Sequence, residues 1–224
     1  KMEVVRVGFV GLGMRGPGAV SRFTYIPGTQ IVALCDYEKE RAEKCQKYLK
    51  EASLPKAAVY SGDKGYEELC KRDDIDLVYI ATPHSHHYLH AKMCLEAGKN
   101  VLCEKAFTVN ADQARKLFAL AKEKNLLITE AIWTRYMPSR KMIDDSISSG
   151  VIGEVTAVTA NLNYAISEVE RIRKPELAGG ALLDVGVYTI NFASMVLGDK
   201  QQILYGKGYI EAVSYTHLTL PTIR

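Results

Sequence analysis

A glycine-rich turn near the start of the chain constrains the fold most. Gly11, Gly13 and Gly16 form a G-x-G-x-x-G pattern in GLGMRG. The turn directly follows the β-branched run Glu3–Val10 and opens a helix-compatible segment that ends near Tyr25. Between a strand and a helix, the three glycines allow a tight turn, close approach to a pyrophosphate, and close packing of helix on strand.

This turn therefore predicts a dinucleotide site, with the N–H groups of the helix N-terminus facing the phosphates. The alternative is a glycine-rich turn that binds nothing. The residues that we expect to contact the phosphates are Gly11, Leu12, Gly13, Met14, Arg15 and Gly16.

Strand and helix patterns alternate over the first 130 residues. Runs with strand character are Gln30–Cys35, Ile75–Ala81, Asn100–Cys103 and Leu126–Glu130. The segments that we expect to be helical are Glu38–Glu51, which is charged with helical spacing, and Gly65–Lys71, Ser85–Ala97 and Ala111–Lys124. The alternation predicts an α/β fold, a Rossmann doubly wound parallel sheet over residues 1–130.

A different pattern begins at residue 131. We expect a helix over Pro138–Ser149, a half-exposed antiparallel strand over Glu154–Tyr164, a buried apolar helix over Gly180–Leu197 and a strand starting in Gln202–Val213. Residues 131–212 are therefore predicted to be a truncated α+β substrate or dimerisation domain.

The last residues need a separate interpretation. Val213–Thr222 resembles the in-frame translation of a sequencing adapter, so we expect residues 213–224 to be a non-native tail and the natural sequence to be cut near Ala212. The alternative is an ordinary C-terminal strand and turn.

Composition excludes several classes of protein. The net charge is +3, and acidic and basic residues are interleaved, so there is no basic stripe for nucleic acid. Five cysteines without a C-x-x-C pair favour reduced thiols in the cytoplasm. We see no leader segment, and the longest uncharged apolar stretch, Val185–Gly198, is too short to span a membrane.

Asp36 ends the second predicted strand, about 20 residues beyond the last glycine. A carboxylate there accepts the ribose hydroxyls of adenosine and repels a 2′-phosphate, which favours NAD(H) over NADP(H). Arg41 lies nearby and could compensate for that repulsion. A turn or helix-cap role of Asp36 is compatible with this function.

Four of the five histidines lie in Thr82–His90. His84, His87 and His90 recur at intervals of three, which suggests a metal site, but no carboxylate or thiolate stands at ligand spacing. Contact with the cofactor is the favoured interpretation, because the segment follows a strand at the ligand-binding edge of the sheet. The residues expected to make it are Thr82, Pro83, His84 and His87. We expect His86 and His90 on the surface.

Glu104 and Lys105 follow the next strand, at the same edge. A solvated Glu–Lys pair is the alternative to a role in the site. Asp184 and Tyr188 share one face of the apolar helix, where a carboxylate and a phenol are costly unless they are paired or functional.

Six segments together resemble the glucose–fructose oxidoreductase/inositol dehydrogenase (Gfo/Idh/MocA) family. Five of them are VGFVGLGMRG, IVALCD, ATPHSHH, AGKNVLCEKA and GGALLDVGVY. The sixth, EAIWTRYMP, and the tyrosine at position 188 look most like the dihydrodiol dehydrogenase-like subgroup. The resemblance implies that Lys105 is the motif lysine near substrate and nicotinamide, with Glu104 beside it, Asp184 the substrate-side aspartate, Tyr188 the catalytic residue, and His87 the motif histidine. Two positions depart from the pattern, since Ala106 replaces a proline and His84 replaces an asparagine.

The implied chemistry is hydride transfer between nicotinamide and a carbinol carbon. A phenol is a weak base at pH 7, and a neighbouring ammonium lowers its pKa. We therefore expect Tyr188 to be the acid/base and Lys105 to tune it and polarise the substrate oxygen, although the reverse assignment stays open. Asp184 would orient Lys105 or bind a substrate hydroxyl. Trp133 and Arg135 either border the pocket or are a core and a surface residue.

The sequence thus predicts an NAD(P)-dependent dehydrogenase or reductase of a sugar or cyclic diol, cytoplasmic and homo-oligomeric, with no metal, membrane or nucleic-acid partner. A non-catalytic dinucleotide sensor or scaffold is one alternative. A redox-neutral relative that uses bound NAD to cleave glycosidic bonds is another.

Overall fold

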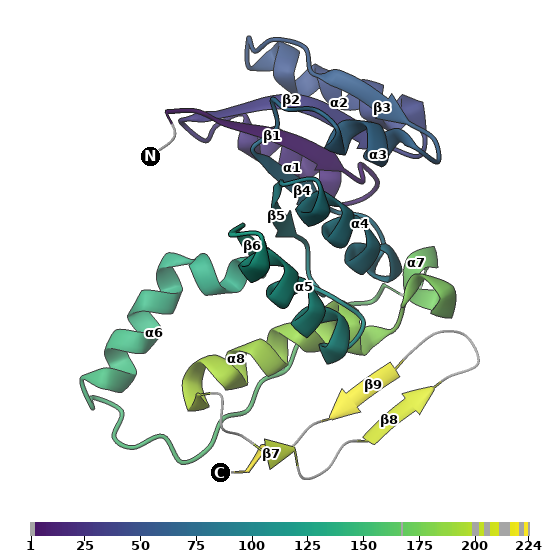
Figure 1. Cartoon of the computed structure of the whole chain (residues 1–224). Coiled ribbons are helices and arrows are strands. Elements are labelled where there is room, and N and C mark those ends of the chain that lie inside the picture. The colour runs from purple at the N-terminus through teal and green to yellow at the C-terminus, as the bar shows by residue number, and fades with distance from the viewer. Residues whose placement is uncertain are drawn as a thin grey trace. The chain divides into compact units, whose positions relative to one another are not determined.

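The computed structural model describes residues 3–166 and 168–198 in full, and the backbone of four short strands beyond them, 202–203, 207–210, 216–219 and 222–223. The chain divides into two compact units, Lys1–Ala131 and Ile132–Arg224. Figure 1 labels most of the helices and strands of both units.

The N-terminal unit is built on a six-stranded parallel sheet (Figure 1). Its strands are β1 (Val5–Val10), β2 (Thr29–Asp36), β3 (Ala58–Ser61), β4 (Leu77–Ile80), β5 (Asn100–Cys103) and β6 (Ile128–Glu130). Their order is β3-β2-β1-β4-β5-β6, so the direction of winding reverses between β1 and β4. This is the doubly wound order of a Rossmann fold, which confirms the predicted α/β class.

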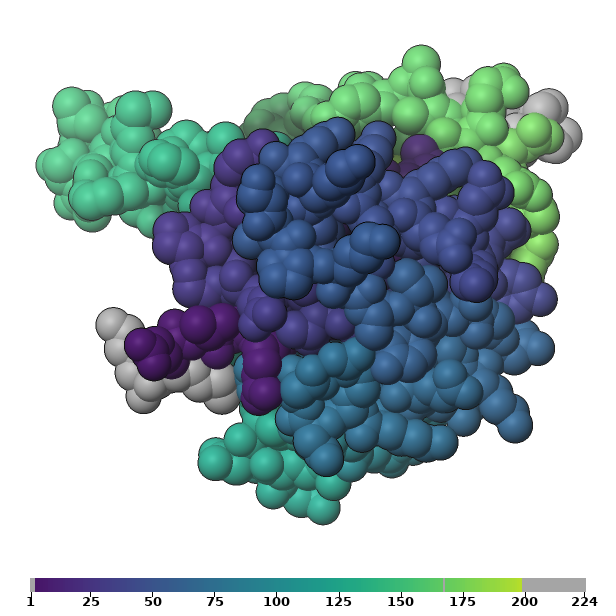
Figure 2. All heavy atoms as spheres, turned by 90° about the horizontal axis from the view of Figure 1, so that it is seen from above, coloured from purple at the N-terminus to yellow at the C-terminus, as the bar shows by residue number. Residues whose placement is uncertain are grey.

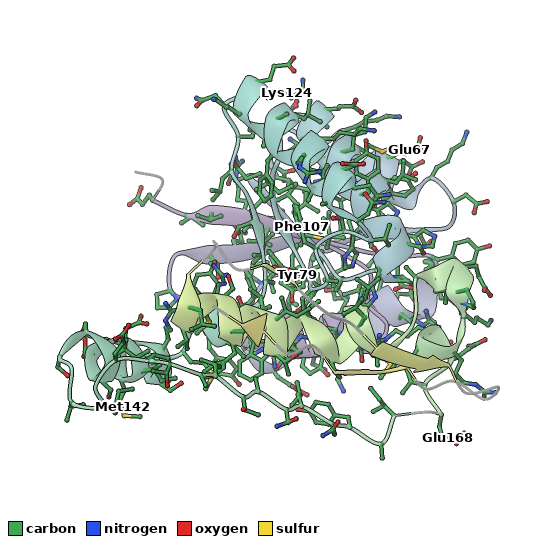
Figure 3. All side chains as sticks on the ribbon, turned by 90° about the horizontal axis from the view of Figure 1, so that it is seen from below. Glu67, Tyr79, Phe107, Lys124, Met142 and Glu168 are labelled. Carbon is green, nitrogen blue, oxygen red and sulfur yellow. The ribbon has the colours of Figure 1, made fainter. Side chains whose placement is uncertain are left out.

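Five helices connect these strands: α1 (Gly16–Phe23), α2 (Lys39–Glu51), α3 (Gly65–Cys70), α4 (His84–Glu96) and α5 (Ala111–Glu123). Buried side chains form two clusters. One joins α1 and α2 to Val7 and Phe9 of β1, and the other joins α3, α4 and α5 to Val10. Figure 2 shows the atoms of this unit packed closely together. Tyr79 and Phe107, labelled in Figure 3, are buried in its interior.

The sequence patterns missed one strand. β3 pairs with β2 in parallel at the edge of the sheet, with Ala58 opposite Ala33 and Ser61 opposite Asp36. All four of its residues are half-buried. A four-residue edge strand carries too little apolar periodicity to be distinguished from a loop.

The second unit contains a 3₁₀ turn at Trp133–Tyr136, α6 (Pro138–Ser148), α7 (Glu170–Arg173), a 3₁₀ turn at Pro175–Leu177, a π-helical turn at Leu182–Gly186 and α8 (Val187–Leu197). β7 (Gln202–Ile203) pairs with β10 (Thr222–Ile223), and β8 (Lys207–Ile210) with β9 (Thr216–Thr219), both antiparallel. The rest of the predicted 202–213 strand and most of the suspected tail lie outside the described residues, so both interpretations stay predictions.

One predicted strand is wrong. Residues 154–164 carry no regular secondary structure. Their alternating pattern is suited to a ladder, but none of the described strands pairs with them. An unpaired strand leaves its backbone groups to solvent and is not stable by itself.

The helix over 180–197 forms, but its predicted burial is wrong. Only Asp184 and Asn191 are buried, while Leu182 and Ile190 are exposed. The helical stretch Pro175–Leu197 is long and apolar enough to cross a membrane by length and composition, and an 18-residue window within it has a mean hydropathy of 1.5. Apolar core helices pass the same test, and this stretch is broken by left-handed Ala178 and carries an ion-paired Asp184.

Candidate functional site

The glycine turn is tight at its first and third glycines and open at its second. Gly11 has a φ of +91°, and a Cβ there would lie 2.6 Å from the backbone of Thr82. A Cβ on Gly16 would lie 2.2 Å from the carbonyl oxygen of Gly11, whereas one on Gly13 would have no neighbour within 4 Å. The turn therefore leaves room over Gly13, where a pyrophosphate approaches the backbone in this kind of motif.

Asp36 lies beside this turn at the carboxyl end of β2. Its Oδ2 accepts a hydrogen bond from the Leu12 N–H at 2.6 Å, and its Oδ1 accepts one from the Glu38 N–H at 3.0 Å. Arg41 approaches Oδ1 at 3.4 Å. A carboxylate has about four acceptor positions, so these contacts leave acceptor capacity for ribose hydroxyls. The residues present thus fit a dinucleotide.

The histidines form a buried face of α4. His84, His87 and His90 are all buried, so the expected surface position of His90 is wrong, while His86 is exposed as expected. His90 Nδ1 and the Thr82 hydroxyl are hydrogen-bonded at 3.1 Å. The His90 ring packs on the Tyr66 ring, with 4.4 Å between the ring centroids. Within residues 3–166 and 168–198, no three His, Cys, Asp or Glu side chains are grouped to hold a metal ion.

His87 joins two loops of the site. Its Nδ1 lies 2.8 Å from the carbonyl oxygen of Ala106, and its Nε2 lies 2.8 Å from that of Thr82. Burial lowers the pKa of His87 to about 4, so the ring is neutral at pH 7 and donates to one carbonyl at a time. The ring is fully buried, and its two contacts connect the loop after β4 to the peptide that follows Lys105.

Glu104 is the centre of a network that the sequence did not reveal. Its Oε1 accepts hydrogen bonds from Arg15 Nε at 2.8 Å and from the hydroxyl of Tyr79. Burial and the Glu104 charge raise the pKa of Tyr79 well above its ordinary value, so Tyr79 remains a hydroxyl donor. The sequence IDLVYIA does not indicate that Tyr79 faces this carboxylate. The residue stands among apolar residues and is expected, like them, to be an ordinary buried position of the strand.

Lys105 follows Glu104 at the carboxyl end of β5, as the sequence predicts. Its backbone N–H donates to Oε2 of Glu104 at 3.3 Å, and the Lys105–Ala106 peptide bond is cis. Ala106 is buried, and its carbonyl meets His87. Side chains on both flanks of Lys105 therefore fix its backbone although the family's proline is replaced.

In the second unit, Asp184 forms an ion pair with Arg171, at 2.8 Å between Nη1 and Oδ1. The Asp184 side chain is buried, and that of Arg171 is about one-third exposed. Asp184 is thus a paired carboxylate, as the cost of burying a charge requires. Arg171 was not anticipated, because it lies outside the family motifs.

Tyr188 and Asn191 continue the polar face of the same helix. The Tyr188 oxygen accepts a hydrogen bond from Trp133 Nε1 at 3.0 Å. Asn191 Oδ1 accepts one from Arg135 Nε at 2.5 Å, and its amide approaches Thr134 at 3.3 Å. The spacing of Asp184, Tyr188 and Asn191 could have revealed Asn191, since all three are polar positions of an apolar helix.

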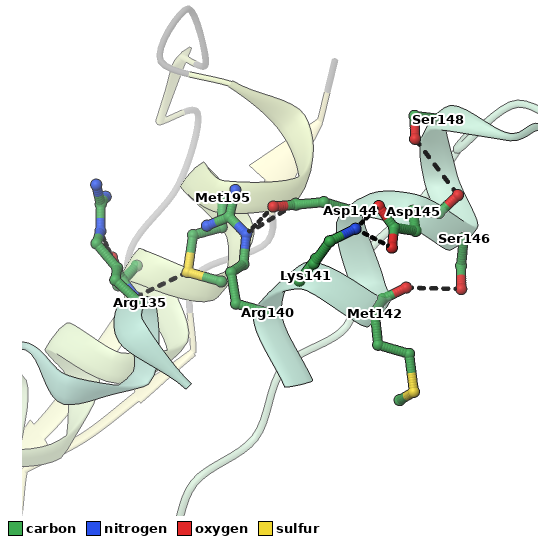
Figure 4. A network of polar contacts seen from close by, with 10 residues as sticks. Arg135, Arg140, Lys141, Met142, Asp144, Asp145, Ser146, Ser148 and Met195 are labelled. Atoms are coloured by element: carbon green, nitrogen blue, oxygen red, sulfur yellow. Dashed lines mark hydrogen bonds and ion pairs between the residues drawn. The ribbon is translucent and has the colours of Figure 1, made fainter. Parts of the chain in front are cut away.

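Figure 4 shows the polar contacts of α6, together with Arg135 and Met195. The amide of Asn191 also approaches the sulfur of Met195 at 3.1 Å. On α6, Arg140 pairs with Asp144 and Lys141 with Asp145, which are helical i,i+4 pairs. Trp133 and Arg135 contact α8 within the second unit, through their hydrogen bonds to Tyr188 and Asn191. Their role at a substrate pocket stays a prediction.

The expected catalytic residues come from both units. Lys105 belongs to the first, and Asp184 and Tyr188 to the second. Their convergence over one substrate stays a prediction.

Two family profiles match the chain. One, described as "Oxidoreductase family, NAD-binding Rossmann fold", matches residues 5–131, and the other, "GFO/IDH/MocA C-terminal domain", matches residues 141–214.

Curated relatives carry several names. The chain is 59% identical over 157 residues to glycosyl hydrolase family 109 protein 5 of Phocaeicola vulgatus, covering 69% of this chain and 30% of the relative. It is 46% identical to the D-xylose 1-dehydrogenase (NADP(+)) of Hypocrea jecorina, over 59% of this chain and 36% of that protein. It is 37% identical to the trans-1,2-dihydrobenzene-1,2-diol dehydrogenase of Xenopus tropicalis, over 81% of this chain and 53% of that protein.

Among solved structures, the chain resembles a variant of KijD10, a 3-ketoreductase from Actinomadura kijaniata in complex with TDP-benzene and NADP. The TM-score is 0.78 at 27% identity, over 97% of this chain and 66% of that one. Structures of that ketoreductase include a tyrosine-to-phenylalanine and a lysine-to-alanine variant. With both profiles matched in order along one chain, and with the Rossmann sheet and its glycine turn in place, the chain belongs to the Gfo/Idh/MocA oxidoreductase family.

Proposed function

We propose that the protein is an NAD(P)-dependent oxidoreductase that transfers a hydride between nicotinamide and a hydroxyl-bearing carbon of a sugar or cyclic diol. The observation that carries this proposal is Lys105 at the carboxyl end of β5, on the same sheet edge as the glycine turn and Asp36. Ligands of doubly wound sheets bind at this edge. The names of the xylose and diol dehydrogenases support the substrate class.

Each residue has a role in this proposal. When bound, the nicotinamide accepts or supplies the hydride. Tyr188 exchanges the hydroxyl proton of the substrate, and the Lys105 ammonium stabilises the phenolate and polarises the substrate oxygen. Asp184 holds a substrate hydroxyl or orients Lys105. Homo-oligomerisation of the whole protein is part of the same proposal.

The proposed cofactor preference is NAD(H) over NADP(H). It is supported by the Asp36 carboxylate, which would face a 2′-phosphate with like charge. Arg41, at 3.4 Å from Asp36, partly offsets that charge. The relatives named for NADP make a direct comparison necessary.

The test is a comparison of full-length protein with its Tyr188→Phe variant on a panel of aldoses, inositols and trans-diols. Formation of NADH or NADPH is followed by absorbance, and both cofactors are titrated by fluorescence. We expect turnover to fall at least a hundredfold in Tyr188→Phe, with cofactor affinity unchanged. A variant as active as wild type would overturn the assigned acid/base.

A second candidate is redox-neutral cleavage of a glycosidic bond, favoured by the 59% identity to a glycosyl hydrolase family 109 protein. Some glycosidases use NAD in this way. The two candidates share the oxidation step and differ in outcome. Release of an aglycone from an aryl glycoside without net formation of NADH identifies the hydrolase, and stoichiometric NADH identifies the dehydrogenase.

A further inference from the structure

Glu104 is a buried anion at the ligand-binding edge of the sheet. Its side chain is 7% exposed, against 46% for its ion-pair partner Arg15. Three segments of the N-terminal unit donate to it: the glycine turn through Arg15, β4 through Tyr79, and the chain after β5 through the Lys105 N–H. These donors hold the carboxylate in a fixed position beside its ion-pair partner.

The topology indicates which part of a dinucleotide would lie near this charge. Asp36 ends β2 and the glycine turn follows β1, so they would hold the adenosine and the phosphates. The strand order places β4 and β5 on the other side of β1. The remaining part of the dinucleotide, the nicotinamide half, would extend toward the ends of these two strands and thus toward Glu104.

The oxidised nicotinamide ring carries a positive charge, and the reduced ring carries none. A neighbouring anion therefore stabilises the oxidised form, and a neighbouring cation destabilises it. The phosphates and the adenosine are identical in the two forms. Their contributions to binding cancel in the ratio of the two dissociation constants, which isolates the effect of charges near the ring.

We propose that the Glu104–Arg15 ion pair sets the relative affinity of the protein for NAD⁺ and NADH, with Glu104 favouring the oxidised form and Arg15 opposing it. This inference rests on the proposed use of NAD(H). Tyr79 and the Lys105 N–H are positioning groups that hold the carboxylate in place. The pair thereby determines in which direction hydride transfer is favoured on the protein.

The test is calorimetric titration of NAD⁺ and of NADH into wild type, Glu104→Gln, Arg15→Gln and the double variant. Relative to wild type, we expect the ratio Kd(NAD⁺)/Kd(NADH) to rise about fivefold in Glu104→Gln and to fall about fivefold in Arg15→Gln. The double variant should return to within about twofold of wild type. Arg22→Gln, an exposed charge change on α1, is the matched control and should leave the ratio unchanged.

Opposite shifts of the ratio in the two single variants distinguish this role from structural damage. A loosened site would weaken the binding of both NAD⁺ and NADH, and the shift of the ratio would not reverse its sign between the two variants. If Glu104→Gln does not fold by circular dichroism, the half-exposed Arg15→Gln still decides the question. Ratios that stay constant, or that move in the same direction, while both ligands bind wild type would overturn this inference alone. A wild-type protein that binds neither form would overturn the proposed function as well.

Discussion

Asp36 Oδ2 accepts a hydrogen bond from the backbone N–H of Leu12 at 2.6 Å, across 24 residues of sequence. This contact attaches the end of β2 to the glycine turn. The residue proposed to select the adenosine ribose therefore also holds the turn proposed to hold the phosphates.

Asp36→Asn should change cofactor preference. The amide keeps one acceptor oxygen and removes the negative charge. We therefore expect the affinity for NADH to fall about tenfold and the ratio Kd(NADPH)/Kd(NADH) to decrease. Fluorescence titration with both reduced cofactors measures the change. Glu38→Gln is the matched control, because Glu38 is an exposed carboxylate two residues away. An unchanged NADH/NADPH ratio in Asp36→Asn would show that Asp36 does not select the cofactor.

Alanine substitutions in the glycine turn should separate folding from binding. A Cβ on Gly16 would lie 2.2 Å from the Gly11 oxygen, so Gly16→Ala should destabilise the N-terminal unit by about 1–3 kcal/mol. Gly13→Ala meets no neighbour within 4 Å, so its thermal unfolding should match wild type. Its methyl group would occupy the space over the turn, and we expect the affinity for NADH to fall at least tenfold. Equal NADH affinity in Gly13→Ala and wild type would exclude the phosphates from this position.

The buried histidines should make stability depend on pH. Burial lowers the pKa of His90 to about 4, below the value of 6.5 for an exposed histidine. Between these two pH values the unfolded chain binds more protons than the folded chain, so the free energy of unfolding rises with pH. The contribution of His90 to stability is therefore lost as the pH falls from about 6.5 to 4. His87 acts in the same window, because its pKa is also lowered to about 4.

His90→Asn keeps a polar group near Thr82 and removes the titration. Each histidine contributes at most about 1.4 kcal/mol per pH unit to the slope of the unfolding free energy against pH in this window. The part of that slope that comes from His87 and His90 should therefore be roughly halved in the variant. Urea unfolding at pH 4.5, 5.5, 6.5 and 7.5 measures both slopes. Parallel slopes for the two proteins would mean that His90 titrates normally in the folded state.

Local patterns were sufficient for the first unit and insufficient for the second. Each strand of the Rossmann sheet except β3 is an apolar run, and the segments between the strands are compatible with helices, so the alternation predicts the sheet. The Glu154–Tyr164 pattern depends on a neighbouring strand, which the sequence of the segment itself does not specify. Likewise, the apolar character of Gly180–Leu197 predicts a helix but does not specify what covers it.

The same difference applies to the site. Gly11, Asp36 and Lys105 are positioned by local geometry, as ends of strands, and their placement at the sheet edge is what the sequence predicts. The Glu104–Arg15 and Asp184–Arg171 pairs join residues 89 and 13 positions apart. Such pairs depend on how whole elements pack, so a single sequence gives no pattern from which to derive them.

The hydrogen bond from Trp133 Nε1 to the Tyr188 oxygen, at 3.0 Å, should affect the proposed acid/base. An N–H donor stabilises a phenolate more than a neutral phenol. In the full-length protein, Trp133→Phe removes the donor and keeps an aromatic ring. We therefore expect the pH at which alcohol oxidation reaches half its maximum to rise by about half a unit to one unit, with KM for the cofactor unchanged.

The pH profile distinguishes tuning of Tyr188 from a loss of packing, because loosened packing lowers kcat at every pH without moving the limb of the profile. Tyr136→Phe is the matched control, since Tyr136 is an exposed aromatic residue of the same 3₁₀ turn. If Trp133→Phe and Tyr136→Phe both keep the wild-type pH profile, Trp133 does not act on the proton of Tyr188. A shift confined to Trp133→Phe would assign the titrating group of the profile to the phenol, because Tyr188 is the partner of the lost donor.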